Sequence, residues 1–216
     1  MEGRIHNMIL GITGGVGTGK STVLQYLQQK YDAFLIQCDD VARDLQQPGG
    51  VCYVPMKELF GPDKDADALF NEDGSFNRSE VAKRVFADEE LLHALNRIVH
   101  PAVKDRVRAL IEAHADAGLI VIEAALLLED HYDEICDEIW YIYARESVRR
   151  ARLKKSRGYT DEKITDIFAS QRSDEAYRAR CTLTIDNSSE NIENTFRQID
   201  TALSERGITD PSAAIP

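Results

Sequence analysis

Short apolar runs alternate with amphipathic segments along most of the chain. Short runs rich in β-branched and aromatic residues are typical of strands, and they occur over residues 8–12, 33–38, 119–122, 139–143 and 183–185. The run Leu119-Ile120-Val121-Ile122 is apolar at every position, as in a parallel strand buried on both faces. The pattern predicts an α/β fold with a doubly wound, five-stranded parallel sheet and helices on both faces.

Helical periodicity and capping residues predict the elements between these strands. Helices are expected over about residues 20–29, 41–47, 55–60, 79–86, 88–99, 101–115, 146–155, 160–172 and 188–206. Asn77 or Ser79 is suited to cap the helix that ends near Phe86. Proline is favoured in the first turn of a helix, so Pro101 predicts that one helix ends near Val99 and another begins after it.

One domain is expected over residues 8–206. The segment between the second and third strands is far longer than one crossover requires, so it should form a mainly helical insertion. Its polar part, 63–77, predicts a loop with a turn at Asp73-Gly74. The expected boundaries are 8–40, 118–145 and 182–206 for the core, 41–117 for the insertion, 146–181 for a lid and 207–216 for a frayed tail.

A glycine-rich loop joins the first strand to the first helix. Its pattern, Gly14-x-x-x-x-Gly19-Lys20-Ser21, is that of a phosphate-binding P-loop in the strand–loop–helix context that the motif requires. Glycines let successive N–H groups turn towards one phosphate, and the helix N-terminus adds more donors. Lys20 should reach the β- and γ-phosphates of ATP, and Ser21 one Mg²⁺ position. The expected ATP contacts are Gly14, Gly15, Val16, Gly17, Thr18, Gly19, Lys20, Ser21 and Thr22.

Composition excludes several classes of protein. The apolar content of 43% suits a sizeable core, but no apolar run is long enough to span a membrane. Residues 1–7 lack the apolar part of an export signal, and the four cysteines show neither C-x-x-C nor zinc spacing. A monomer in a reducing cytoplasm is therefore expected. The net charge of −11 argues against a nucleic-acid or anionic-membrane partner.

A basic segment stands out in this acidic chain. Seven cationic residues opposed only by Glu146 lie between positions 145 and 157: Arg145, Arg149, Arg150, Arg152, Lys154, Lys155 and Arg157. Most of them suit a solvated helix face. As a group, in a P-loop protein, they predict an anion-facing lid.

The motifs that are absent narrow the type of P-loop protein. The chain lacks the N-K-x-D and D-x-x-G motifs of GTPase switches and the L-S-G-G-Q signature of ABC transporters. What remains is Asp39 after the second strand, with the basic lid near the end of the chain. The carboxyl ends of parallel strands share one edge, so the P-loop, Asp39 and residues 123–129 should surround one crevice. This layout suits a small-molecule kinase, which must position two substrates and exclude water.

Five segments of the chain match the motifs of one kinase family. The matches are Gly11–Thr22 to G-L-T-G-G-I-G-S-G-K-S-T, Gln37–Arg43 to D-A-D-x-x-A-R, His100-Pro101 to H-P, Ala125–Glu129 to P-L-L-F-E, and Ile185–Asn187 to I-D-N. Through them the span from Met8 to about Arg206 resembles the dephospho-coenzyme A kinases. The resemblance implies ATP-dependent phosphorylation of the ribose 3′-hydroxyl of dephospho-coenzyme A, with Mg²⁺. The rivals are a nucleoside monophosphate or shikimate kinase, and a non-catalytic nucleotide-binding regulator.

The resemblance also assigns roles to residues. Asp39 matches the catalytic carboxylate; physically it could orient the hydroxyl, accept its proton or join a Mg²⁺ shell, or it could cap a helix, for which Asp40 is better placed. Glu123 suits a Mg²⁺-bound water or a buried partner. The candidate acceptor contacts, each with a structural alternative, are Arg78, Arg84, His100, Leu126 and Leu127.

Three departures from the family pattern matter. Gln37 replaces the first Asp of D-A-D, and Ala125 replaces the Pro of P-L-L-F-E. The lid pattern R-L-x-x-R-D-G becomes Arg152-Leu153-Lys154-Lys155-Ser156-Arg157-Gly158, so Ser156 stands where the family has its second arginine. Arg152 is therefore expected to be the catalytic lid arginine, with Arg157 as its alternative.

Overall fold

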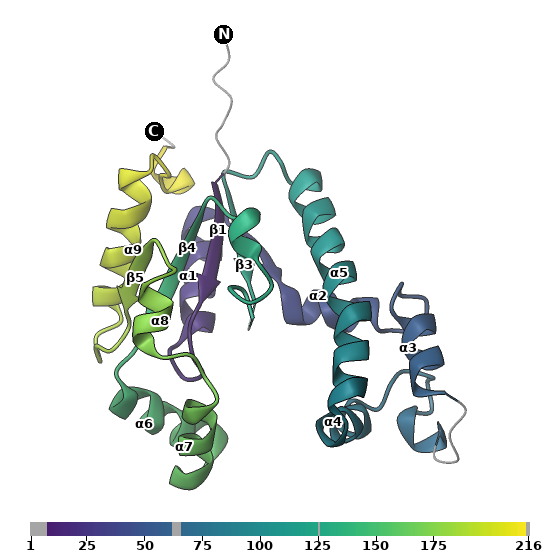
Figure 1. The fold of residues 1–216 in the computed structure, drawn as a ribbon. Coiled ribbons are helices and arrows are strands. Elements are labelled where there is room, and N and C mark those ends of the chain that lie inside the picture. Colours follow the sequence, from purple (N-terminus) through teal and green to yellow (C-terminus); the bar gives the residue numbers. More distant parts are fainter. Residues whose placement is uncertain (1–7, 62–65, 125, 215–216) are drawn as a thin grey trace. The chain divides into compact units, whose positions relative to one another are not determined.

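A five-stranded parallel sheet organises the protein. The computed structural model describes residues 8–61, 66–124 and 126–214. The strands are β1 (Met8–Thr13), β2 (Phe34–Gln37), β3 (Leu119–Glu123), β4 (Glu138–Tyr143) and β5 (Leu183–Asp186). They lie in the order β2-β3-β1-β4-β5, which confirms the predicted α/β fold (Figure 1). The substitution at Ala125 lies outside the described residues.

The chain forms two compact units, residues 1–36 with 114–216 and residues 37–113. In the described part of the first, the helices are α1 (Lys20–Tyr31), α6 (Glu146–Arg157), α7 (Asp161–Ala169), α8 (Asp174–Arg178) and α9 (Glu193–Glu205), with 3₁₀ turns at Tyr132–Glu134 and Pro211–Ala214. In the second they are α2 (Cys38–Leu45), α3 (Tyr53–Phe60), α4 (Arg78–Ala87) and α5 (Glu89–Ala113), with a 3₁₀ turn at Ala66–Leu69. Within the described residues, none of these helices has the length and apolar character needed to cross a lipid bilayer.

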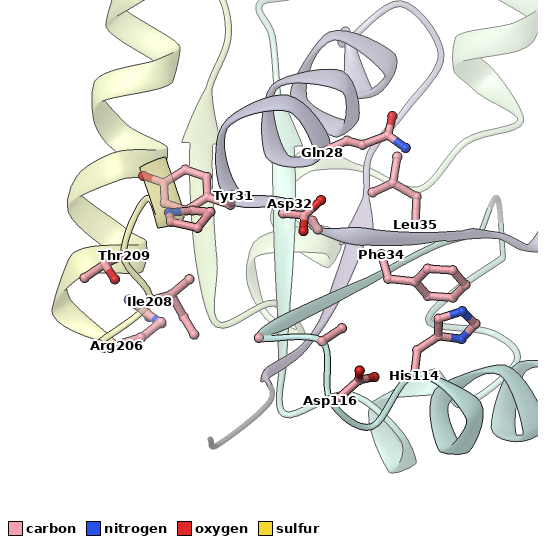
Figure 2. Close-up of a pocket in the computed structure, with 15 residues that line it drawn as sticks. Gln28, Tyr31, Asp32, Phe34, Leu35, His114, Asp116, Arg206, Ile208 and Thr209 are labelled. Carbon is pink, nitrogen blue, oxygen red and sulfur yellow. The ribbon is translucent and has the colours of Figure 1, made fainter. Parts of the chain in front are cut away.

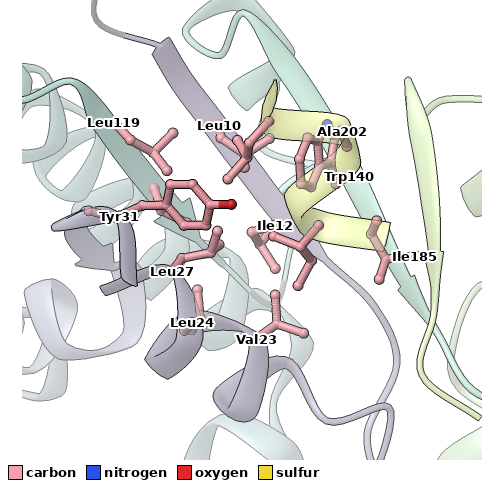
Figure 3. Close-up of a cluster of buried hydrophobic side chains, with 14 of the residues drawn as sticks. Leu10, Ile12, Val23, Leu24, Leu27, Tyr31, Leu119, Trp140, Ile185 and Ala202 are labelled. Atoms are coloured by element: carbon pink, nitrogen blue, oxygen red, sulfur yellow. The ribbon is translucent and has the colours of Figure 1, made fainter. Parts of the chain in front are cut away.

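One face of the sheet packs against α1 and α9. Alternate residues of the central strands, including Leu10, Ile12 and Trp140, are completely buried there. They meet Leu27 of α1 and Ile199 of α9 in a single hydrophobic cluster (Figure 3). This packing fixes α1 against the sheet, and α1 begins where the glycine loop ends.

The other face of the sheet is covered differently. A Cβ atom on Gly11 would lie 3.0–3.3 Å from atoms of Cys136, Ile139 and Leu127, so the chain that follows β3 packs closely over this face beside β4. Beside it, the ring of Tyr141 in β4 stacks on Tyr177 of α8, with centroids 4.7 Å apart. None of the four cysteines, all within the described residues, forms a disulfide.

Helix α5 differs from the prediction of two helices separated at Pro101. It is continuous over 25 residues with Pro101 inside it. A proline here removes one backbone hydrogen bond. The buried residues Val99, Val103 and Val107 form one apolar stripe that continues across the proline, and α5 packs against α2, α3 and α4. Packing on both sides of Pro101 therefore outweighs the free-energy cost of the lost hydrogen bond.

Three smaller expectations also need correction. Helix α2 begins at Cys38, before the expected start at Val41, because the chain turns helical immediately after the extended Gln37. Part of the predicted 63–77 loop forms the 3₁₀ turn at 66–69, although the turn at Asp73-Gly74 is present. The tail is not frayed over its described residues, since Ile208 packs against the main core and residues 211–214 form a 3₁₀ turn.

A polar network joins α1 to α9 beside the core. The Asp200 carboxylate accepts hydrogen bonds from the hydroxyls of Tyr26 and Tyr31, at 2.7 and 2.8 Å, and from the ammonium of Lys30 at 2.8 Å. The ring of Tyr26 also stacks on Phe196. Burial acts to raise the pKa of Asp200, but the hydrogen bonds from these three partners together hold it below its ordinary value.

Removing the charge of Asp200 should loosen α1 from α9. We expect Asp200→Asn to lower the melting temperature at pH 7 by about 3–6 °C, because charge-assisted hydrogen bonds contribute on the order of 1–2 kcal/mol. The folded-state pKa is lowered, so this contribution is present above the unfolded-state pKa of about 3.9 and disappears as the pH falls through the folded-state value.

Calorimetry from pH 7 to pH 2.5 measures this difference. The control is Asp105→Asn, which removes a carboxylate that is 77% exposed and paired with Arg108 one helical turn away. It should shift the melting temperature by less than about 2 °C. A difference between wild type and Asp200→Asn that stays constant at all pH values would contradict a role for the charge.

Candidate active site

The glycine loop between β1 and α1 has the conformation of a phosphate-binding loop. Gly17 and Gly19 have φ values of 82° and 91°, a region that non-glycine residues rarely adopt. Thr18 is completely buried, and both its N–H and its hydroxyl donate to the carbonyl of Gly15, at 3.3 and 2.9 Å. Helix α1 begins at Lys20, so its unpaired N–H groups belong to the loop and first turn. The residues predicted to contact ATP, 14–22, thus form this loop and the first turn of α1.

Lys20 lies across the loop. Its ammonium donates to the carbonyl of Gly14 at 2.9 Å and lies 3.5 Å from a carboxylate oxygen of Glu123. The two side chains are 20% and 14% exposed, so the pair is largely shielded from solvent. Glu123 ends β3, the strand that neighbours β1, and this places its carboxylate beside the loop. Glu123 therefore has a structural partner in Lys20, which is one of the two roles expected for it.

Two arginines of the basic helix α6 face the loop. The Nε of Arg149 donates to the carbonyl of Val16 at 2.9 Å, and its Nη2 donates to the Oε1 of Gln171. Arg152 donates to the carbonyls of Thr18 and Asn187, at 3.1 and 2.9 Å, and less closely to Gly17. Burial lowers the pKa of both guanidinium groups.

Three other cations of the cluster have partners away from the loop. Arg150 pairs with Glu146 at 2.8 Å, and Lys154 with Asp161 at 2.6 Å. Arg157 is exposed, and its guanidinium lies 5.8 Å from the ring centroid of Tyr159. The helix separates the two groups because positions 149 and 152 share one face while 150 and 154 share another.

Sequence reasoning did not single out Arg149, Gln171 or Asn187 as contacts of the loop. Asn187 is 1% exposed, and its Nδ2 donates to the carbonyl of Thr18 at 2.8 Å. Asn187 belongs to the I-D-N segment, which was a signal of resemblance without an assigned role. Gln171 accepts from the N–H of Val16 at 3.3 Å. These contacts join residues more than 130 positions apart, so no local spacing predicts them.

Asp39 lies on the other compact unit, in the first turn of α2. It is exposed, and it belongs to the helix and not to a loop after β2. Neither Asp39 nor Asp40 caps this helix, because the N-cap is Gln37, which makes no side-chain capping bond. Asp40 instead pairs with Arg43 at 2.6 Å. The capping alternative is thus wrong for both carboxylates.

The other candidate acceptor residues differ in environment. Arg78 begins α4 and is exposed, whereas Arg84 is partly buried and lies 3.4 Å from Glu80. His100 is partly buried in the middle of α5. Leu126 is 46% exposed, but Leu127 is completely buried beneath Gly11, as core packing requires.

The oxygen donors near the loop fit a magnesium ion bound together with nucleotide phosphates. Ser21 is exposed in the first turn of α1, and Glu123 adds a carboxylate beside the same loop. Within residues 8–61, 66–124 and 126–214, no group of three or more His, Cys, Asp or Glu side chains forms a metal site of its own. Mg²⁺ usually keeps several waters and takes few protein ligands when it binds phosphates, so this sparse donor set suits it.

A separate cavity of about 820 Å³ lies at the opposite edge of the sheet (Figure 2). It is lined by the end of α1, the start of β2, residues 114–118 before β3 and the segment after α9. Phe34 and His114 stack on each other there, with ring centroids 3.5 Å apart. None of the P-loop residues lines this cavity.

The chain matches known proteins over most of its length. The family model described as dephospho-CoA kinase matches residues 8–193. A dephospho-CoA kinase of Carboxydothermus hydrogenoformans is 36% identical, covering 90% of this chain and 92% of that protein. The Corynebacterium diphtheriae enzyme of the same name is 35% identical, covering 83% and 88%. A Thermus thermophilus crystal structure has a TM-score of 0.75 at 28% identity, covering 93% of this chain and 98% of that one.

These matches agree with the site in the described residues. A P-loop with its lysine, a carboxylate at the end of the neighbouring strand and two arginines of α6 all belong to one compact unit. The chain belongs to the dephospho-CoA kinase family, whose members are ATP-dependent kinases that phosphorylate an alcohol group in the last step of coenzyme A biosynthesis.

Proposed function

We propose that this chain transfers the γ-phosphoryl group of ATP to the ribose 3′-hydroxyl of dephospho-coenzyme A, with the P-loop as its triphosphate site. The observation that carries the proposal is the loop itself, with its left-handed glycines and its lysine held across it. Phosphoryl transfer depends mainly on positioning and on stabilising charge. Lys20 supplies charge at the β- and γ-phosphates, where negative charge shifts during the reaction.

Magnesium is the second part of the proposal. The Ser21 hydroxyl and the carboxylate of Glu123 are the protein groups that would hold the ion, Glu123 through a water molecule. Glu123 also pairs with Lys20 at 3.5 Å, so it orients the lysine before the nucleotide arrives. Bound Mg²⁺ would neutralise part of the triphosphate charge.

The acceptor side of the reaction rests on the other compact unit. We assign Asp39 to the acceptor hydroxyl, which it orients and deprotonates. Its exposed position in the first turn of α2 leaves the carboxylate accessible to a substrate. Arg78 and Arg84 are assigned to acceptor phosphates, with His100 as a further contact from the same unit. Leu126, from the first unit, is assigned as another acceptor contact. Leu127 is completely buried against Gly11 in the first unit, where it contributes packing.

An acceptor panel tests the function. We expect ADP release with dephospho-coenzyme A, and little with nucleoside monophosphates, with shikimate or without an acceptor. Lys20→Ala should abolish nearly all of this turnover, because the lysine stabilises developing charge. A coupled ADP assay with Mg²⁺-ATP measures both.

The controls separate loss of activity from loss of structure. Lys20→Ala should melt cooperatively, since its side chain contacts a carbonyl and a carboxylate and not the hydrophobic core. Turnover with shikimate or a nucleoside monophosphate would identify a different kinase. Acceptor-independent hydrolysis would favour a nucleotide-binding regulator, and full activity in folded Lys20→Ala would exclude the P-loop as the site.

The role of Asp39 leads to a second prediction. A general base typically contributes 10²–10⁴-fold, so Asp39→Asn should lower kcat by about that factor with ATP affinity little changed. The matched control is Asp40→Asn, the next residue, which pairs with Arg43 at 2.6 Å. It should retain kcat within about threefold, and Gln37→Asp should change kcat only modestly. Steady-state kinetics would reject the assignment if Asp39→Asn lost less than about fivefold.

The lid arginines give a third prediction. We assign Arg152 to the transferring phosphoryl group, so Arg152→Ala should reduce kcat and kcat/KM together by about 10²-fold or more. Arg157 lies on a different helix face and is exposed beside Tyr159. Arg157→Ala should therefore cost less than about tenfold in kcat.

Two results would change this assignment. In the structure Arg152 donates to carbonyls of the loop and of Asn187, so it already holds the loop in the absence of phosphate. If Arg152→Ala raised KM for ATP and spared kcat, the arginine would only hold the loop. A larger kcat loss in Arg157→Ala would show that Arg157 replaces the family arginine missing at Ser156.

A further inference from the structure

We propose that Asn187 is a positioning residue for the kinase reaction, which fixes the Thr18–Gly19 peptide of the P-loop in the orientation that binds ATP. This inference rests on the proposed role of the loop as the triphosphate site. Asn187 follows β5, and it contacts the loop 169 positions away in the sequence. Its side chain is 1% exposed, so its polar atoms need partners within the protein.

The orientation of the Asn187 amide is determined by its two partners. The carbonyl of Thr18 can only accept, so the Nδ2 group must face it, at 2.8 Å. The Oδ1 atom then accepts the hydroxyl proton of Thr195, at 2.9 Å. Thr195 is completely buried in α9. Two hydrogen bonds therefore connect α9 through Asn187 to the loop.

Fixing the carbonyl of Thr18 also fixes the N–H of Gly19. A trans peptide is planar, with its C=O and N–H on opposite sides. The Thr18 carbonyl points to Asn187, so the Gly19 N–H points away from it, at the start of α1. The same argument applies two residues earlier in the loop. Arg149 donates to the carbonyl of Val16 at 2.9 Å and thereby orients the N–H of Gly17.

Gly19 shows how closely Asn187 approaches. A Cβ atom at position 19 would collide with the Nδ2 of Asn187 and would lie 3.3 Å from a guanidinium nitrogen of Arg152. The glycine is thus required both by its φ of 91° and by the space that the amide occupies. Asn187 acts on Arg152 as well, because its main-chain carbonyl accepts from that side chain at 2.9 Å.

Amide orientation and packing can be separated by isosteric changes. Asn187→Asp keeps the shape but replaces the donor to Thr18 with an acceptor, leaving a buried carbonyl facing a carboxylate. The dissociation constant for a non-hydrolysable ATP analogue with Mg²⁺ should rise on the order of tenfold or more, which corresponds to about 1.4 kcal/mol. The hydrogen bonds that Asn187 makes to the loop, α6, β4 and α9 all lie within the first compact unit, whereas Asp39 belongs to the second. KM for dephospho-coenzyme A should therefore change less than about twofold.

A matched control uses the same chemical change nearby. Asn191 is exposed, and its Oδ1 accepts from the N–H of Glu193, a bond that aspartate preserves. Asn191→Asp should leave the ATP-analogue dissociation constant within about twofold of wild type. This control repeats the change from amide to carboxylate at an exposed position four residues along the chain.

Thr195 provides a second, milder test if Asn187→Asp folds poorly. Thr195→Val removes the hydroxyl that orients the amide and should weaken binding of the ATP analogue about three- to tenfold. Thr195→Ser keeps the hydroxyl and should restore affinity to within about twofold of wild type. A purely structural role would lower the melting temperature in Thr195→Val without changing affinity measured well below it.

Calorimetric titration distinguishes the outcomes. If wild type does not bind the ATP analogue, the proposed function fails. If wild type binds and folded Asn187→Asp binds equally well, or if Thr195→Val and Thr195→Ser have the same affinity, the positioning role of Asn187 is wrong while the proposed function stands.

Discussion

A phosphate loop can direct its N–H groups to one side only if the carbonyl oxygens of the same peptides are satisfied on the other side. In this protein Arg149 holds the carbonyl of Val16, and Arg152 and Asn187 hold that of Thr18. These donors come from α6 and from the segment after β5, far from the loop in sequence. Leaving such a buried carbonyl without a donor costs about 1–3 kcal/mol. The conformation of the loop therefore depends on the second half of the chain.

The sheet places these donors where the loop needs them. β4 lies next to β1, and β5 lies next to β4, so the segments that follow these strands emerge beside the loop at the same edge. α9 then returns along the face that it shares with α1, where Asp200 joins the two helices. The core and the polar network thus fix α9 relative to α1. This positions Asn187, which is bonded to α9, against the loop that precedes α1.

The sequence predicted the features that arise from contiguous residues. Apolar runs identified all five strands, and the glycine spacing identified the loop. It failed where packing between distant elements decides the outcome. Pro101 marks a helix start locally, yet Val99 and Val103 keep α5 continuous by packing on both sides of it. Asp40 looked like a cap, but α2 starts at once from the extended Gln37, and Asp40 pairs with Arg43 instead.

The roles of the charged residues at the site could not be predicted from the sequence either. A count of cations identifies a basic segment between positions 145 and 157 but does not distinguish the roles of its members. Helical geometry does so, because Arg149 and Arg152 share the face towards the loop while Arg150 and Lys154 face acidic residues. Exposed ion pairs of this second kind contribute little stability. These pairs neutralise Arg150 and Lys154, whereas Arg149 and Arg152 donate to carbonyl oxygens and so keep their positive charge beside the loop.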